Sequence, residues 1–264
     1  MRTEYDVIFL GSSCFAMGCA AQRPGDCLVL ESGEGFGPEF VDALRACGSI
    51  RRPEGPGAAL YDELVARGVM DGDSAARGEL HLPALNVVLN RAALELGLNM
   101  LFRARVIGRR AVPGGVELDA VCCARVVTLR CRRVIDTRST DYDRVARLDP
   151  SARFGIAANL YAPSTPSADM NGMGVRRGFL PGEAFLTMPV NRPSPLDREA
   201  LLRTFEARPD EWMEARLLRV AAARPVLCRA IREEEEGGLF IPGCGFDNPV
   251  AAWAAGLAEK EALA

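Results

Sequence analysis

A turn of small residues after an apolar segment has the composition to bind the phosphate groups of a nucleotide. Residues 5–10, YDVIFL, predict a buried strand, and Gly11 begins the segment GSSCFAMGCAAQ, which is small, turn-rich and then helical. Such a turn presents free N–H groups and the positive end of a helix dipole to a pyrophosphate, and small side chains allow close approach. The pattern G-x-G-x-x-G is incomplete, since Ser13 and Ala16 replace its second and third glycines.

An acidic residue at the end of the next apolar segment strengthens this prediction. CLVLES, residues 27–32, predicts a second strand, and Glu31 lies 20 positions after Gly11 (31 − 11 = 20). A carboxylate at this spacing accepts hydrogen bonds from ribose hydroxyls, and it disfavours the 2′-phosphate of NADP. The alternative is a small-residue helix packed on a buried strand, with Glu31 solvated. The turn, the two strands and the acid together favour an adenine dinucleotide.

The remaining patterns predict a mixed α/β chain. A helix is expected over 83–97, because its apolar residues recur at helical spacing and Gly97 follows. A helix opened by Ser194-Pro195, a second one reaching about 222, and a last one capped by Asp247 are also expected. Short strands are expected at 100–109, 115–122, 125–131, 132–137, 153–161, 183–190 and 238–243.

The composition is that of an ordinary globular protein. Of 264 residues, 48% are hydrophobic and 25% are charged, and the net charge of -3 indicates neither a nucleic-acid footprint nor a polybasic membrane patch. We see no signal-peptide core and no apolar run long enough to span a bilayer. The nine irregularly spaced cysteines are interpreted as reduced core residues of a cytoplasmic protein, and one histidine excludes a multi-histidine metal centre.

With these segments in place, the sequence resembles the FAD-dependent oxidoreductases of the glutathione-reductase structural type over most of its length. DVIFLGSSCFAMGCAA is similar to their phosphate-binding segment, and LVLES to their second strand with its ribose acid. LFRARVIGRR and VIDTRST resemble two later strands of that family. GLFIPGCGFDNPVAAWAAGLA is similar to its closing strand and helix, which a simple nicotinamide-dependent dehydrogenase lacks.

The resemblance implies an α/β fold in which a Rossmann-like FAD-binding domain with a parallel sheet (1–140 and 232–264) carries an inserted smaller α+β substrate domain (141–231). FAD would extend from adenosine near Glu31 and Val106 to flavin near residues 243–249. The cofactor-binding residues implied are Gly11, Ser12, Ser13, Cys14, Phe15, Ala16, Glu31, Ser32, Val106, Thr137, Gly243, Asp247 and Asn248.

The function that this resemblance implies is FAD-dependent oxidation or reduction of a small organic substrate, with an external electron donor or acceptor. Arg138 stands where the family has a glycine, and Cys244 where it has an acid, so Asp247 is expected to contact the ribityl chain. These replacements motivate the alternative of a degenerate, non-catalytic nucleotide-binding or scaffold protein. Cys244 is the one weak catalytic candidate, because a thiol beside a helix N-terminus has a lowered pKa; the alternative is a buried structural cysteine.

Overall fold

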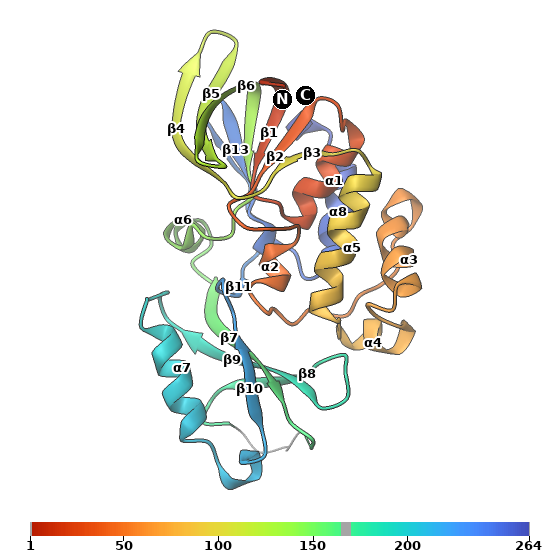
Figure 1. The fold of residues 1–264 in the computed structure, drawn as a ribbon, viewed down its shortest axis with the longest axis vertical. Helices are drawn as coiled ribbons and strands as arrows, with labels where there is room; N and C mark the ends of the chain where they lie inside the picture. Colours follow the sequence, from red (N-terminus) through yellow and green to blue (C-terminus); the bar gives the residue numbers. More distant parts are fainter. Residues whose placement is uncertain (1, 165–169, 264) are drawn as a thin grey trace.

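The computed structural model describes residues 2–164 and 170–263, which form two β-sheets with helices packed around them (Figure 1). The strands are β1 (Glu4–Leu10), β2 (Cys27–Leu30), β3 (Asn99–Leu101), β4 (Ala104–Val112), β5 (Gly115–Cys122), β6 (Arg125–Asp136), β7 (Arg153–Tyr161), β8 (Gly174–Arg177), β9 (Glu183–Val190), β10 (Arg216–Val220), β11 (Val226–Leu227), β12 (Glu233–Glu235) and β13 (Gly238–Phe240). The α-helices are α1 (Cys14–Gln22), α2 (Pro38–Val41), α3 (Ala58–Ala66), α4 (Gly72–Arg77), α5 (Leu82–Glu95), α6 (Tyr142–Leu148), α7 (Asp197–Glu206) and α8 (Pro249–Ala258). Short 3-10 turns are η1 (Gly55–Gly57), η2 (Asp210–Trp212), η3 (Gly243–Gly245) and η4 (Glu261–Leu263).

The first sheet has a parallel centre of the Rossmann type. Its strands follow the order β12-β13-β6-β1-β2-β3, and β1 pairs in parallel with both β2 and β6. The strand β13 begins 102 residues after the end of β6 (238 − 136 = 102) and pairs with it in parallel, so the end of the chain returns to the sheet of its beginning. Parallel strands run in one direction, and their carboxyl ends therefore meet at one edge, where ligands bind in open α/β sheets.

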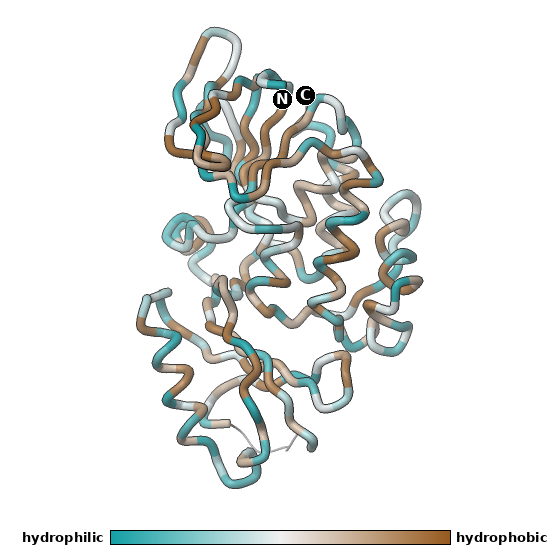
Figure 2. The backbone as a smooth tube through the Cα atoms, viewed as in Figure 1, coloured by the Kyte–Doolittle hydropathy of each residue, from teal (hydrophilic) through white to brown (hydrophobic). Residues whose placement is uncertain are grey.

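Side-chain alternation in the central strands divides this part of the molecule into two layers. Val7 and Phe9 on β1 face the core formed with α1, α5 and α8, whereas Ile8 and Leu10 face the antiparallel strands β4, β5 and β6. The strand is buried on both faces, which explains why it reads as a continuous apolar run. Figure 2 shows such brown, apolar segments concentrated in the central strands and on the helices beside them.

Two glycines let α1 and α8 come into close contact on one face of the parallel sheet. A Cβ on Gly18 would lie 2.3 Å from the Trp253 carbonyl oxygen, and a Cβ on Gly256 would lie 2.3 Å from the Phe15 carbonyl oxygen. The final helix is therefore held directly against the helix whose N-terminus follows the β1 turn.

The second sheet is antiparallel and lies beyond the carboxyl edge of the first (Figure 1). Its strands follow the order β10-β7-β9-β8, with β11 also paired to β7. Trp212 and Leu201 are fully buried in a separate apolar core under this sheet. The molecule thus has a mixed α/β fold with a Rossmann-like parallel sheet and a second, antiparallel sheet.

Several local expectations are confirmed and others are wrong. Helix α5 occupies 82–95, close to the predicted 83–97, and β6 is a single long strand where two short ones were expected. The helix expected after Pro209 is the turn η2 followed by strand β10, because pairing with β7 determines the local structure there. No helix of the described residues is long and apolar enough to cross a membrane.

The caps of the two late helices also differ from expectation. Helix α7 begins at Asp197, whose carboxylate accepts from the Ser194 N–H at 2.8 Å, so Ser194 is not its capping residue. The cap of α8 is Asn248, whose side chain accepts from Ala251 N at 2.8 Å, and Asp247 is exposed. Asparagine satisfies free N–H groups at a helix start as well as aspartate does.

The contact between α1 and α8 predicts that Gly18→Ala destabilises the protein. The added methyl group meets backbone atoms, which cannot rotate away, and overpacking of this kind costs roughly 1–3 kcal/mol. Urea denaturation followed by circular dichroism measures the change. The matched control is Gly72→Ala in α4, where nothing lies within 4 Å of the added Cβ; equal stability of the two variants would contradict the close contact.

Candidate functional site

The carboxyl ends of the central parallel strands meet at the N-terminus of α1. Gly11 follows β1, Glu31 follows β2 and Thr137 follows β6. Six of the residues expected to bind the cofactor line one cleft of about 240 Å³ at this edge: Gly11, Ser12, Ser13, Glu31, Ser32 and Thr137. The residues are thus brought together by the parallel sheet from three distant parts of the chain.

The turn from β1 into α1 has the backbone form that phosphate-binding turns require. Gly11 has a φ of +97°, a conformation that L side chains rarely adopt. Ser13 caps α1 by accepting a hydrogen bond from Ala16 N at 3.0 Å. The Thr137 hydroxyl donates to the Gly11 carbonyl oxygen at 3.0 Å and so ties the turn to the end of β6. The Ser13 side-chain oxygen therefore caps the N-terminus of α1, a role that the glycine pattern did not indicate.

The Glu31 carboxylate points into this cleft and organises the turn around it. Its Oε2 accepts from the Ser12 backbone N–H at 2.9 Å, and its Oε1 from the Gly33 N–H at 2.7 Å. The hydroxyl groups of Ser12 and Ser32 lie at 2.9 and 3.1 Å from the two oxygens. A carboxylate has about four acceptor positions. The Ser12 hydroxyl is buried and also lies 2.6 Å from the Gly35 carbonyl oxygen, so a ribose hydroxyl would take the place of the Ser32 hydroxyl.

A second acid, Glu39 on α2, occupies the start of α1. Its Oε1 accepts from the Cys14 backbone N–H at 2.9 Å, a group that would otherwise face a phosphate. Its Oε2 is buried and has no hydrogen-bond partner. Burial raises the pKa of this carboxyl to about 7, and the Cys14 N–H lowers it in part. Sequence reasoning missed Glu39, although an acid directly after Gly37-Pro38 is a recognisable first-turn position.

Arg138 lies over the turn at the position where a glycine was expected. Its guanidinium donates to both carboxylate oxygens of Asp136, at 2.9 and 2.6 Å. A Cβ placed on Gly11 would be 3.0 Å from Arg138 Cγ, so this side chain covers the turn. About half of the Arg138 side chain is exposed, and the Asp136 carboxylate that holds it is buried.

The other expected cofactor residues lie around this cleft rather than on it. Val106 is on β4, two residues after Ala104, whose N–H donates to the Glu31 carbonyl oxygen at 2.9 Å. Gly243 N donates to the Thr137 carbonyl oxygen at 2.9 Å, which places η3 beside the turn. Phe15 is stacked on Phe246 with ring centroids 5.2 Å apart. Cys14 and Ala16 are buried in the core, and Asp247 and Asn248 follow η3.

Cys244 is buried in η3 and faces a second thiol. Its Sγ lies 3.4 Å from Cys228 Sγ, and its N–H donates to the Ser139 hydroxyl at 2.9 Å. The hydrogen bond from Cys228 lowers the pKa of Cys244, and the Arg45 guanidinium and the Ser139 contact act in the same direction against burial. The two cysteines form a close dithiol that the sequence, where they are 16 residues apart, did not indicate. Cys244 stays a prediction as a catalytic candidate.

In the described part of the chain, no three His, Cys, Asp or Glu side chains lie close enough together to hold a metal ion.

Comparison with known proteins relates this geometry to a fold. No protein-family model matches the chain, and no curated protein matches its sequence. Solved structures do match. A geranylgeranyl bacteriochlorophyll reductase-like protein of Thermoplasma acidophilum has a TM-score of 0.63 at 13% identity, over 97% of this chain and 76% of that one. Glycine oxidase of Geobacillus kaustophilus has a TM-score of 0.61 at 15% identity, over 97% and 93%. The p-nitrophenol 4-monooxygenase of Pseudomonas putida has a TM-score of 0.59 at 14% identity, over 95% and 78%.

The chain shares the fold of these reductase-like, oxidase and monooxygenase structures. These identities show the fold alone. The narrower assignment to the glutathione-reductase structural type stays a prediction, as do the domain limits and the individual cofactor contacts.

The residues at the β1 turn fit FAD under two conditions. The adenosine end fits, because Glu31 points into the cleft and carries an exchangeable hydroxyl donor, Ser32. The pyrophosphate requires a neutral Glu39 carboxyl, since an ionised one would repel it from the α1 amides. It also requires more space, because ligand pockets span about 300–1,000 Å³ and the cleft, which Arg138 helps to line, has about 240 Å³. The unpartnered Glu39 Oε2 would then find a hydrogen-bond partner.

The contacts of Glu31 predict that Glu31→Ala lowers the free energy of unfolding by roughly 1–3 kcal/mol, because it strands the N–H groups of Ser12 and Gly33. Chemical denaturation measures this change. Glu34→Ala is the matched control, since Glu34 lies in the same loop but is exposed and paired with Arg103 at the surface; exposed pairs of this kind contribute about 0–1 kcal/mol. A stability of Glu31→Ala equal to that of the control would remove the structural role of Glu31.

The buried carboxyl of Glu39 predicts a pH-dependent stability. Burial raises its pKa to about 7 from the ordinary 4.5, so folding takes up a proton between these values and the protein loses stability as the pH rises through that window. Glu39→Gln should therefore be more stable than the wild type at pH 8, by an amount of the order of 3 kcal/mol, and the difference should vanish near pH 4.5. Urea denaturation at a series of pH values tests this, with exposed Glu54→Gln as the control. Parallel stability curves for Glu39→Gln and the wild type would refute it.

Proposed function

We propose that this protein is an FAD-dependent oxidoreductase, of the glutathione-reductase structural type, that acts on a small organic substrate. The observation that carries the proposal is the meeting of the Gly11 turn, the N-terminus of α1 and the Glu31 carboxylate in one cleft at the carboxyl edge of the parallel sheet. Dinucleotides bind at this position in α/β proteins. The solved structures that share the fold include a reductase-like protein, an oxidase and a monooxygenase, and a further one is described as a flavoprotein/dehydrogenase, which supports a flavin cofactor without naming a substrate.

The residues that would hold FAD follow from the placement of the elements. The adenosine would contact Glu31 and Val106, and the pyrophosphate would face residues 11–16. The flavin would lie near residues 243–249, at the start of α8. The isoalloxazine ring supplies two-electron chemistry when bound. The chain contributes the α1 dipole for the pyrophosphate, the Arg138 guanidinium as a positive charge, and the Glu39 carboxyl, which would be held protonated.

The wider parts of the proposal concern domains, partners and compartment. Residues 1–140 and 232–264 would bind the cofactor, and 141–231 would bind the small-molecule substrate. An external electron donor or acceptor completes the reaction. All nine cysteines are free thiols, which favours a reducing compartment such as the cytoplasm.

A second candidate function is a non-catalytic protein of the same fold that serves as a partner or scaffold. The closing of the cleft by the chain's own groups favours it, since Glu39 takes an α1 amide and Arg138 covers Gly11. In that case the Glu39 carboxyl permanently takes the place of the pyrophosphate at the start of α1, and the Arg138 guanidinium remains over the Gly11 turn.

Titration with FAD at two pH values separates the two candidates. Because the pyrophosphate favours the neutral Glu39 carboxyl, binding should take up a proton, and the affinity should fall by up to about tenfold per pH unit above pH 7. Glu39→Gln should bind FAD more tightly than the wild type at pH 8, with little pH dependence. Quenching of flavin fluorescence, and a flavin spectrum that survives desalting, measure both effects.

The control for this titration is Asp42→Asn. Asp42 also lines the cleft, but its carboxylate accepts no hydrogen bond from the described N–H groups of α1. This variant should therefore retain the pH dependence of FAD binding. If neither the wild type nor Glu39→Gln binds FAD at pH 6, the oxidoreductase proposal fails and the non-catalytic candidate replaces it.

A further inference from the structure

Outside the β1 cleft, a pocket of about 570 Å³ between the two sheets could hold a small molecule. Its floor comes from the second sheet, with Arg153 on β7, Arg176 on β8 and Thr187 on β9. Its opposite wall comes from the first half of the chain, with Arg45 in the turn after α2, and from Asp247 beside η3. The pocket is thus built from both parts of the molecule and adjoins the segment where flavin is proposed.

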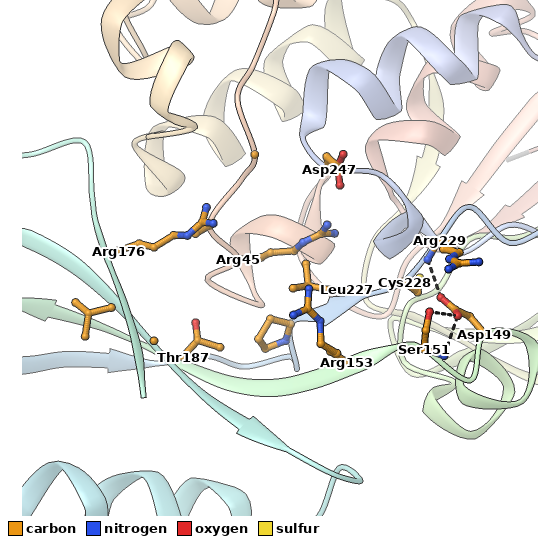
Figure 3. Close-up of a pocket in the computed structure, with 15 residues that line it drawn as sticks. Arg45, Asp149, Ser151, Arg153, Arg176, Thr187, Leu227, Cys228, Arg229 and Asp247 are labelled. Atoms are coloured by element: carbon orange, nitrogen blue, oxygen red, sulfur yellow. Dashed lines mark hydrogen bonds between the residues drawn. The ribbon is translucent and has the colours of Figure 1, made fainter. Parts of the chain in front are cut away.

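This pocket is lined by Arg45, Arg153 and Arg176, and Arg176 Nη1 also donates to the Cys47 carbonyl oxygen at 2.9 Å. Figure 3 shows the Arg153 and Arg176 side chains extending from the second sheet towards Arg45, with Asp247 on the opposite side. Arg229 also lines the pocket, at the end that Asp149 occupies. Among the described residues, no carboxylate oxygen lies within 4.0 Å of the guanidinium nitrogens of Arg45, Arg153 or Arg176. Most of the charge in this pocket is therefore positive and uncompensated.

Arg45 is the decisive member of this group, because it is buried with no carboxylate oxygen of the described residues within 4.0 Å, and the Glu39 carboxyl acts on it only from a longer distance. Only 4% of its surface is exposed. Nη1 donates to the Cys244 carbonyl oxygen at 3.0 Å, the guanidinium lies 5.2 Å from the Phe40 ring centroid, and Nε has no acceptor. Arginine is almost never buried unless it is paired, and leaving such a charge unpaired is costly. An anion in the pocket would supply the missing partner.

The acidic residues of the pocket do not fill that role. The Asp149 Oδ1 accepts from the Ser151 N–H and hydroxyl at 3.0 and 2.6 Å, and its Oδ2 from the Arg229 N–H at 2.8 Å. Its carboxylate is therefore occupied by local donors. Asp247 is exposed and is the one remaining carboxylate among the lining residues.

We propose that this pocket binds a small organic molecule that carries at least two anionic groups, carboxylate or phosphate, between Arg45 on one side and Arg153 and Arg176 on the other. A guanidinium matches the planar, paired oxygens of such groups. The volume suits a small molecule rather than a polymer. Only the identification of the bound anion as the substrate rests on the proposed function. The binding site itself is inferred from the three arginines.

Isothermal titration calorimetry on the purified protein, at low ionic strength, tests the site with three probes: citrate, inorganic pyrophosphate and uncharged glucose. Citrate or pyrophosphate should bind saturably and more weakly as salt is added, and glucose should not bind. Preference for citrate assigns carboxylates, and preference for pyrophosphate assigns phosphoryl groups. Arg153→Ala and Arg176→Ala should each weaken binding roughly tenfold, the scale of one lost hydrogen bond to a charged group.

The matched control is Arg177→Ala, which removes the neighbouring charge on β8 that does not line this pocket. It should bind like the wild type. Arg45→Met should abolish binding; because its burial can affect folding, the two exposed arginines keep the test decisive. The proposal is overturned if neither anion binds saturably, or if Arg177→Ala loses as much affinity as Arg176→Ala.

Flavin titration keeps this result separate from the proposed function. Arg153 and Arg176 do not line the cleft at the β1 turn, so both alanine variants should retain whatever FAD affinity the wild type has. A protein that binds citrate but no FAD retains the anion site and loses the oxidoreductase proposal. A protein that binds FAD but neither anion retains the oxidoreductase proposal and loses the anion site.

Discussion

The contact on which this structure depends is the hydrogen bonding of two carboxylates to backbone N–H groups at the start of α1. Glu31 holds the Ser12 N–H and Glu39 holds the Cys14 N–H, so two segments that are apart in sequence are tied to the β1 turn. The free N–H groups at a helix start are an anion site by their nature. In this protein the chain's own carboxylates occupy part of that site. Whether the cleft binds a dinucleotide therefore depends on whether a phosphate can replace the Glu39 carboxylate at the Cys14 N–H.

The same constraint explains why the fold favours dinucleotide binding while the acidic residues of the cleft oppose it. The parallel sheet, the returning strand β13 and the close contact of α1 with α8 belong to a fold that this chain shares with solved reductase-like and oxidase structures. The cleft within that fold is small and lined by acids. A buried carboxyl with a pKa of about 7 reconciles the two, because it is poised between a charged group that excludes phosphate and a neutral one that can accommodate it.

A different balance of charge holds between the sheets. The β1 cleft gathers Glu31, Glu39 and Asp42, whereas the larger pocket gathers Arg45, Arg153 and Arg176. Arg45 connects the two regions, since it follows α2, the helix that carries Glu39, and donates to the carbonyl oxygen of Cys244 in η3.

Much of the frame was determined by the sequence itself. Strand β1, the Gly11 turn, the acid at 31 and helix α5 were all predictable, because each depends on local periodicity or on a backbone conformation that few residues adopt. The tertiary structure alone decided the rest. Residues 210–220 became a turn and a strand rather than a helix, because β7 offered them a pairing edge. Glu39, Arg138 and the arginines of the larger pocket acquired their roles through burial and long-range approach, and neither property is visible in the spacing of residues along a chain.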